Sequence, residues 1–137
     1  MTLMNDGDKP MRVHVSANPA STNDNGVIEY GKNNITVDKS LTANVGKMIS
    51  VPDTVWIPAH GTTQFTAKLR VQKEKFSGIA VGGISFVTDA DKGRTQSTGV
   101  QINNRYAYDM GVVLHESSDK VAPNLNIHQV RATSVNY

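Results

Sequence analysis

The sequence predicts an all-β fold, an antiparallel β-sandwich with one short helical segment. Val and Ile together number 24 residues and Thr adds 12, whereas Leu occurs only 5 times. β-branched side chains are restricted at χ1 and fit a pleated sheet better than a helix. Apolar and polar residues also alternate with a period of two in several segments, and turn-forming residues separate these segments. The chain of 137 residues is long enough for one domain with a hydrophobic core.

The strands are expected where this alternation is clearest. They cover residues 2–5, 11–17, 27–30, the segment that starts at residue 55, and residues 65–71, 79–87 and 98–116. Asn, Asp, Gly and Pro fill the connections, and Asn25-Gly26 is expected to supply the positive φ of a tight turn. Six or seven strands joined by short turns are typical of a β-sandwich.

One helical segment is expected before Pro52, which would end it. Either Asp38 or Ser40 can serve as its N-cap. The apolar residues with helical spacing are Leu41, Val45, Met48 and Ile49.

Two strand patterns predict local features. In residues 79–87 the apolar side chains change parity at Gly82-Gly83, which predicts a one-residue bulge there. In residues 98–116, Tyr106 and Tyr108 share the parity of the apolar side chains. We therefore expect both rings to be buried, with their hydroxyl groups hydrogen-bonded. The alternative is that the rings are exposed and stack on a ligand.

Trp56 is the candidate ligand-binding residue. Val55 and Ile57 form a plausible inward-facing pair, and this leaves the indole of Trp56 pointing outward. An exposed Trp can anchor sugar rings or a partner protein. The alternative is that the indole packs beneath a loop.

Several classes of function lack the residues they need, so no enzyme activity and no cofactor are expected. The 14 basic and 12 acidic residues are scattered, without the basic stripe of a nucleic-acid binder. The absence of Cys excludes thiol nucleophiles and Cys-ligated zinc. Residues 89–93 resemble the start of a calcium loop, but Val100 occupies the position of the acidic ligand, so a hairpin turn is favoured. No apolar stretch approaches the roughly 18 residues of a membrane span.

The spacing of the four histidines does not favour metal ligation. They lie far apart in the sequence and none has a partner two or four residues away, which favours ordinary strand or loop positions. They are His14, His60, His115 and His128.

Four segments, taken in order, resemble the N-terminal peptidoglycan-binding domain of the WxL-interacting proteins of Gram-positive bacteria. The resemblance covers residues 2–117, and each motif is weak alone but fairly specific in this order. The motifs are Leu3–Asn5 and Lys9–Pro10 with Thr22–Gly26 and Tyr30; Ile57–Ala59; Phe76–Ile84; and Arg105–Tyr108 with Gly111–Val112 and Leu114.

The resemblance implies an immunoglobulin-like sandwich without enzymatic activity, located on the bacterial surface or cell wall. Its expected partners are peptidoglycan and WxL-domain surface proteins, with host extracellular-matrix proteins as further candidates, and its parent protein is expected to be membrane-anchored. The alternative is a purely protein-binding adhesion module that does not bind sugar.

The resemblance also implies a domain boundary. Residues 1–117 are expected to form the peptidoglycan-binding-type domain, and residues 118–137 a linker and the start of a truncated, host-binding-type domain. The family usually has a further strand upstream of Thr2, so this chain is expected to leave a strand edge unpaired. The strand-like residues 124–137 could fill that edge within the chain or in a strand-swapped dimer, and the other interpretation is a frayed tail.

Overall fold

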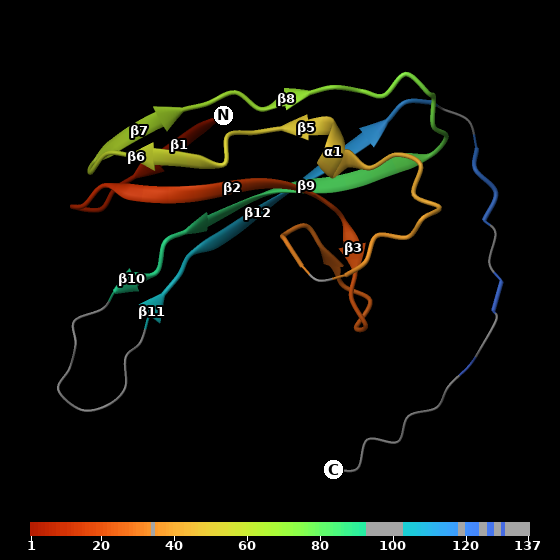
Figure 1. Ribbon diagram of the computed structural model, residues 1–137, viewed down its shortest axis with the longest axis horizontal. Coiled ribbons are helices and arrows are strands. Elements are labelled where there is room, and N and C mark those ends of the chain that lie inside the picture. The colour runs from red at the N-terminus through yellow and green to blue at the C-terminus, as the bar shows by residue number, and fades with distance from the viewer. Residues whose placement is uncertain (34, 93–102, 118–119, 124–125, 128–129, 131–137) are drawn as a thin grey trace, which may run out of the picture.

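The structure is a computed structural model that describes residues 1–33, 35–92, 103–117, 120–123, 126–127 and 130 (Figure 1). The described residues form twelve strands and one helical turn. The strands are β1 (Thr2–Asn5), β2 (Met11–Pro19), β3 (Ser21–Thr22), β4 (Ile28–Glu29), β5 (Ile49–Ser50), β6 (Thr54–Ile57), β7 (Gly61–Gln64), β8 (Lys68–Leu69), β9 (Ile79–Thr88), β10 (Asp91–Lys92), β11 (Asn103–Asn104) and β12 (Ala107–His115), and the helix is α1 (Val45–Met48).

The central element is a four-stranded antiparallel sheet in the order β12-β9-β2-β6. Along one side of it lie the two-stranded β1–β7 and β5–β8 ladders, together with α1 (Figure 1). The core fills the space between these layers, and the centroids of the Phe65 and Phe86 rings are 6.3 Å apart across it. Its buried members include Val13, Val15, Val45, Ile49, Val55, Ile57, Ile84 and Phe86. The predicted all-β sandwich is confirmed, whereas the immunoglobulin-like assignment stays a prediction.

The helix is shorter than the apolar spacing predicted, and its N-cap is neither Asp38 nor Ser40. Asn44 caps α1, with its side-chain oxygen accepting a hydrogen bond from the Lys47 amide at 3.2 Å. Asp38 instead accepts from the Ser40 amide in a separate turn, and Leu41 is exposed. The helix also ends before Pro52, because Ile49 already pairs with Leu69 in the β5–β8 ladder.

The strand predicted at 65–71 forms only in part: β7 comes first in a run over residues 61–69, β8 follows after a break at 65–67, and Leu69 and Val71 are exposed. Burial alternates from Gly61 to Ala67, as the period of two requires. β7 pairs with β1 at the start of the run, and β8 pairs with β5 at its end. The alternation was visible in the sequence, but the change of partner depends on the tertiary arrangement of β1 and β5.

The bulge predicted at Gly82-Gly83 is absent, and the prediction is wrong. The register of β9 runs without interruption against both β2 and β12 through these residues. Ile79 faces away from the core and is 65% exposed, so the parity change needs no correction by the backbone. The glycines permit close packing instead. A Cβ on Gly82 would lie 2.7 Å from the Val45 Cβ, and one on Gly83 would lie 2.6 Å from the Tyr30 Cβ.

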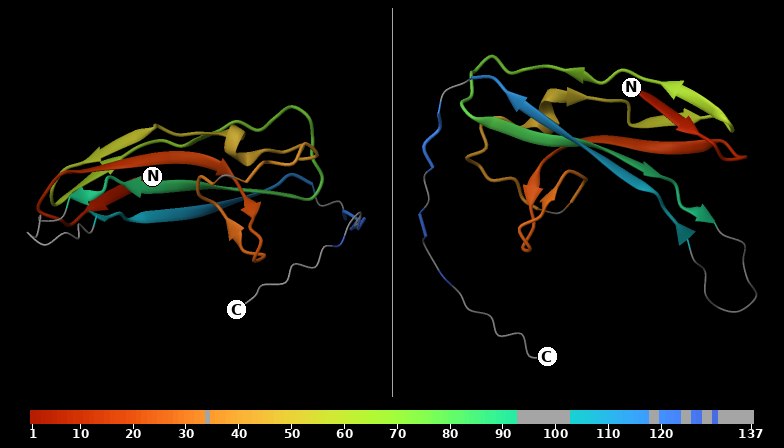
Figure 2. Two further views of the ribbon diagram at one scale, coloured as in Figure 1. Left: turned by 60° about the horizontal axis from the view of Figure 1, so that its bottom comes forward. Right: turned by 180° about the vertical axis from the view of Figure 1, so that it is seen from behind.

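The burial predicted for Tyr106 and Tyr108 is also wrong, because both residues are 67% exposed. The parity itself holds, since Tyr108 pairs with Phe86 and the two ring centroids are 6.3 Å apart. β12 is an edge strand at the rim of the sheet (Figure 2), and the second layer leaves much of its core-facing side uncovered. Sequence parity predicts which face a side chain shares, but not whether another layer covers that face.

Candidate binding site around Trp56

Trp56 lies on the outer face of the central sheet. Val55 and Ile57 are buried on either side of it along β6, while Trp56 is 60% exposed. The carbonyl of Trp56 accepts a hydrogen bond from the Thr63 hydroxyl at 2.7 Å, which fixes the backbone between β6 and β7. The predicted outward orientation of this side chain is therefore confirmed.

Arg12 lies directly opposite Trp56 in the register of β2 and β6. The central carbon of its guanidinium, Cζ, is 5.7 Å from the centroid of the indole ring. This distance is within the range of a cation–π interaction, which favours Arg over the face of Trp. The contact holds the indole on the sheet surface while leaving much of the ring accessible.

Asp89, which follows β9, joins Arg12 to His14. Its carboxylate accepts a hydrogen bond from Arg12 Nε at 2.6 Å and lies 2.7 Å from His14 Nε2. The hydrogen bonds from Arg12 and then from His14 lower the pKa of Asp89 and favour its ionised form. Asp89 in turn raises the pKa of Arg12. All three side chains are partly exposed, so this network orients Arg12 and contributes little to stability.

A second set of contacts fixes the turn beside Trp56. The buried side chain of Asn5 donates to the carbonyls of Lys9 and Pro58, at 2.8 and 3.1 Å, and accepts from the Gly7 amide. His60 adds a contact at the same place, because its Nε2 lies 2.9 Å from the Asp8 carboxylate. The turn between β1 and β2 is thus tied to the turn between β6 and β7.

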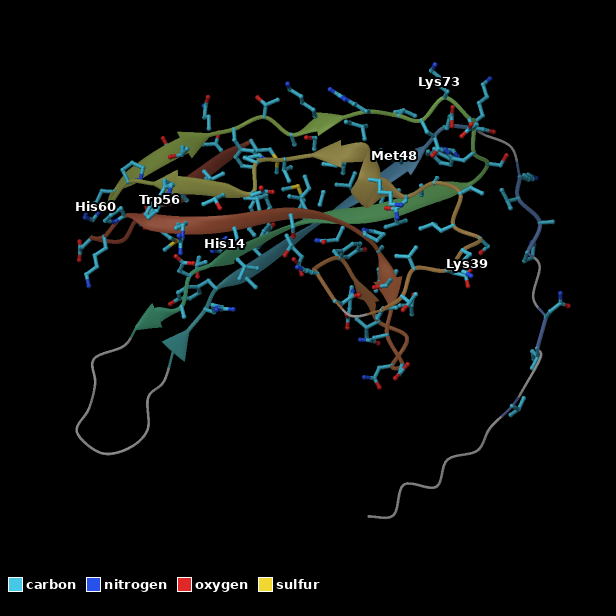
Figure 3. The ribbon with its side chains drawn as sticks, in the orientation of Figure 1. His14, Lys39, Met48, Trp56, His60 and Lys73 are labelled. Atoms are coloured by element: carbon cyan, nitrogen blue, oxygen red, sulfur yellow. The ribbon has the colours of Figure 1, made fainter. Side chains whose placement is uncertain are left out.

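These elements enclose a surface hollow of about 550 Å³. Its rim combines aromatic and charged side chains, a composition suited to a polar ligand with apolar faces. Trp56 and His60 lie at one end of the molecule, and Lys39 and Lys73 at the other (Figure 3). The hollow is lined by Asn5, Gly7, Asp8, Lys9, Pro10, Met11, Arg12, Trp56, Thr88, Asp89, Ala90 and Tyr106.

Two further hollows lie near the segment that precedes α1. One, of about 390 Å³, includes Phe76 and Ile35 in its lining. The other, of about 680 Å³, is larger than the hollow at Trp56 and is lined by cations, including Lys39, Lys47 and Arg70. Neither contains an exposed aromatic platform comparable to Trp56.

The histidines and acidic residues are distributed over separate contacts. His14 and His60 approach different carboxylates, His115 lies at the end of β12, and His128 lies outside the described residues. Within the described part of the chain, no three His, Asp or Glu residues are grouped closely enough to hold a metal ion. The candidate calcium loop at 89–93 begins with Asp89, which bonds to Arg12 and His14, and its continuation from residue 93 lies outside the described residues. None of the described helices is long and apolar enough to cross a membrane.

Sequence reasoning found Trp56 but missed its neighbours. Arg12, Asp89 and Tyr106 come from three separate parts of the chain and meet only through the pairing of β2, β6, β9 and β12. Parity predicts that Tyr106 is buried in the core, but the residue lines this hollow. The one available signal was the polar parity of Arg12 and His14 on β2, which places them on the same outer face as Trp56.

The chain matches two family models along its length. Residues 1–88 match the peptidoglycan binding domain of the WxL Interacting Protein, and residues 97–137 match the host binding domain of the same protein. The chain belongs to the WxL-interacting protein family. This membership confirms the resemblance inferred from the four sequence segments. No curated protein and no solved structure matches the chain with significant similarity.

Both matched domains of this WxL-interacting protein are named for binding, which supports a non-catalytic role at the cell surface or wall. The second match begins at residue 97 and includes β12. β12 nevertheless pairs along its whole length with β9, which lies in the first match. The boundary at residue 117 therefore stays a prediction, and the pairing of β12 with β9 is the observation that favours it.

Proposed function

We propose that this chain is a non-catalytic module that binds peptidoglycan through the hollow beside Trp56. The observation that carries this proposal is the Arg12–Trp56 pair, an exposed aromatic face held in place beside charged side chains. A sugar ring presents apolar C–H faces that can stack on an indole, and its hydroxyls and amides can bond to the polar rim. The family match supplies the ligand class.

In this proposal the module acts on the Gram-positive cell wall, as part of a membrane-anchored parent protein, and assembles there with WxL-domain proteins. Residues 1–117 form the wall-binding domain, and residues 118–137 lead into a host-binding domain whose partner is an extracellular-matrix protein. The second match, at 97–137, supports the host-binding part.

The test compares sedimentation of the protein with insoluble peptidoglycan sacculi for the wild type and Trp56→Ala. Ile28→Ala is the matched control, because Ile28 is an exposed apolar residue on the separate β3–β4 hairpin. We expect Trp56→Ala to reduce sedimentation while Ile28→Ala sediments like the wild type. Equal sedimentation of all three proteins would remove Trp56 from the site. Loss of wall turbidity on incubation with the protein would contradict a non-catalytic role.

The second candidate is a purely protein-binding module. It is favoured by the presence of Trp, Tyr and Arg around one hollow, since these residues dominate binding energy at protein interfaces. A pull-down on a purified WxL domain, run beside the pull-down on bare sacculi, distinguishes the two functions. Capture by the WxL domain together with no binding to sacculi would favour this candidate.

A further inference from the structure

The free edge of β12 is a feature of the fold that the Trp56 site does not use. β12 pairs with β9 on one side, and no described strand pairs with it on the other. None of its nine residues is fully buried, and Val113 is 62% exposed. Among the described residues, no strand pairs with the backbone groups on its free side, and exposed side chains such as Tyr108 and Val113 lie beside them.

This edge lacks the features by which edge strands normally avoid pairing. Prolines, lysines and bulges protect such edges. β12 contains no Pro, Lys or Arg, and its register with β9 is unbroken over nine residue pairs. Asp109 is its one acidic residue. A long, regular and largely apolar edge of this kind is a template for an added strand.

We propose that β12 pairs antiparallel with β12 of a second copy of this chain, about a two-fold axis at Gly111. Residues directly opposite one another in an antiparallel pair point to the same face. The core-facing residues of one copy must therefore meet core-facing residues of the other. Centring the pair on Gly111 satisfies this condition and overlaps all nine residues of each strand. The two central sheets then form one continuous eight-stranded sheet.

The side chains are complementary in this register. On the core-facing side, Tyr108 lies opposite the partner's Leu114, and Met110 opposite the partner's Val112. These apolar residues are only partly covered within one chain, so the second copy buries what the second layer leaves open. The interface thereby continues the existing core along the sheet.

The polar residues avoid conflict on the other face. Asp109 lies opposite the partner's Val113, so the two like charges do not meet. His115 lies opposite the partner's Ala107 and diagonal to the partner's Asp109, within reach of a long side chain. A second copy of β12 therefore matches this edge in two respects: apolar side chains meet on the core-facing side, and like charges do not meet on the other side.

The register can be tested at a single position by two opposite charges. Val113→Lys would place a cation opposite the partner's Asp109 twice, by symmetry, and Val113→Asp would place two like charges there. The oligomeric state of the full chain is measured by sedimentation equilibrium over a range of protein concentrations. Val27→Lys and Val27→Asp are the controls, because Val27 is also exposed but lies in the turn between β3 and β4.

We expect a concentration-dependent dimer for the wild type, about tenfold weaker dimerisation for Val113→Asp, and dimerisation at least as strong as wild type for Val113→Lys. The Val27 variants should match the wild type. A monomeric wild type at every concentration would overturn the proposal. Equal effects of the two Val113 variants would also overturn it. Both variants would dimerise normally if the copies exchanged their C-terminal segments instead, and failure of both variants to dimerise would show that the sign of the charge at this position does not matter.

Discussion

Arg12 and Trp56 face each other across β2 and β6, with the guanidinium carbon 5.7 Å from the centroid of the indole. Arg12 is held there by Asp89, which also contacts His14. The aromatic surface is thus positioned by a charged network before any ligand arrives. Pre-positioned side chains lose less conformational entropy on binding, which favours affinity.

Trp56 is the single tryptophan of the chain, so its fluorescence reports on the proposed site alone. We expect emission typical of an exposed indole, with a shift to shorter wavelength and weaker quenching by acrylamide when soluble peptidoglycan fragments bind. Trp56→Ala should weaken binding by about 1–2 kcal/mol, the magnitude of a moderate contact residue. A saturable binding signal by calorimetry without any change in fluorescence would place the ligand elsewhere.

Arg12→Ala should reduce binding without much loss of stability. Its ion pair with Asp89 is exposed to solvent, and such pairs contribute little to stability. The variant should therefore unfold near the wild-type temperature, while acrylamide quenches Trp56 more strongly because the cation no longer covers one face of the ring. Arg70→Ala is the control. Arg70 lines the hollow of about 680 Å³ near α1, away from Trp56, so its loss should leave the quenching unchanged.

Asp89 should make a small contribution to the loss of stability at acid pH. The pKa of Asp89 is lowered in the folded chain, so unfolding in acid is coupled to proton uptake by this carboxylate. Its contribution is present above the unfolded-state pKa of about 3.9 and is lost as the pH falls through the lower folded-state value. Asp89→Asn should flatten the acid limb of the unfolding profile. If the free energy of unfolding of Asp89→Asn depended on acid pH in the same way as that of the wild type, the contacts to Arg12 and His14 would not couple folding to protonation.

Gly82→Ala should destabilise the fold, because its new methyl group would lie 2.7 Å from both the Val45 Cβ and the Asn18 carbonyl oxygen. We expect a loss of about 1–3 kcal/mol, typical of overpacking. Gly111→Ala is the milder control, since the nearest atoms to its methyl group would be those of the Tyr30 ring, at 3.3 Å. Denaturant unfolding that ranks Gly111→Ala as the more damaging change would contradict this packing.

A chain ending at residue 117 should keep the fold, whereas one ending at residue 88 should lose it. The shorter chain would lack β12 and would expose β9, whose residues pair with β12 along nine positions. Thermal unfolding followed by circular dichroism measures the difference. Cooperative unfolding of the chain ending at residue 88 would instead support a domain boundary at the end of the first family match.

Local pattern was enough to predict most strands and the orientation of Trp56. The alternation of apolar and polar residues in β2 and β6 predicts which face of the sheet each side chain occupies. The structure confirms the inward face for Val13, Val55 and Ile57, which are buried. The positive φ expected in the Asn25-Gly26 turn also occurs, at Gly26 with φ of 76°. These features are local, so nearby residues determine them.

The incorrect predictions of a bulge in β9 and of buried tyrosines concern contacts between distant segments, whereas the incorrect helix N-cap is a local error. Gly82 and Gly83 suggested a bulge because the sequence does not show that Val45 and Tyr30 approach them from opposite sides. Tyr106 and Tyr108 have core parity, but no periodicity in β12 indicates where the second layer ends. The hollow at Trp56 was missed as a group for the same reason, since Arg12 and Asp89 are 77 positions apart.

The strand order β12-β9-β2-β6 has a consequence for how the chain folds during synthesis. β2 is made early, but its neighbour β9 follows only after α1 and the β5–β8 ladder, and β12 comes later still. In a chain that is still being synthesised or exported, the edge of β2 that will pair with β9 is therefore unpaired. This holds however strongly the sequence of β2 favours a strand. Folds that depend on non-local strand pairing form slowly, and their unpaired strand edges stay exposed until the partner strand is available. Until β12 has been synthesised, such a chain is therefore exposed to incorrect strand pairing and aggregation.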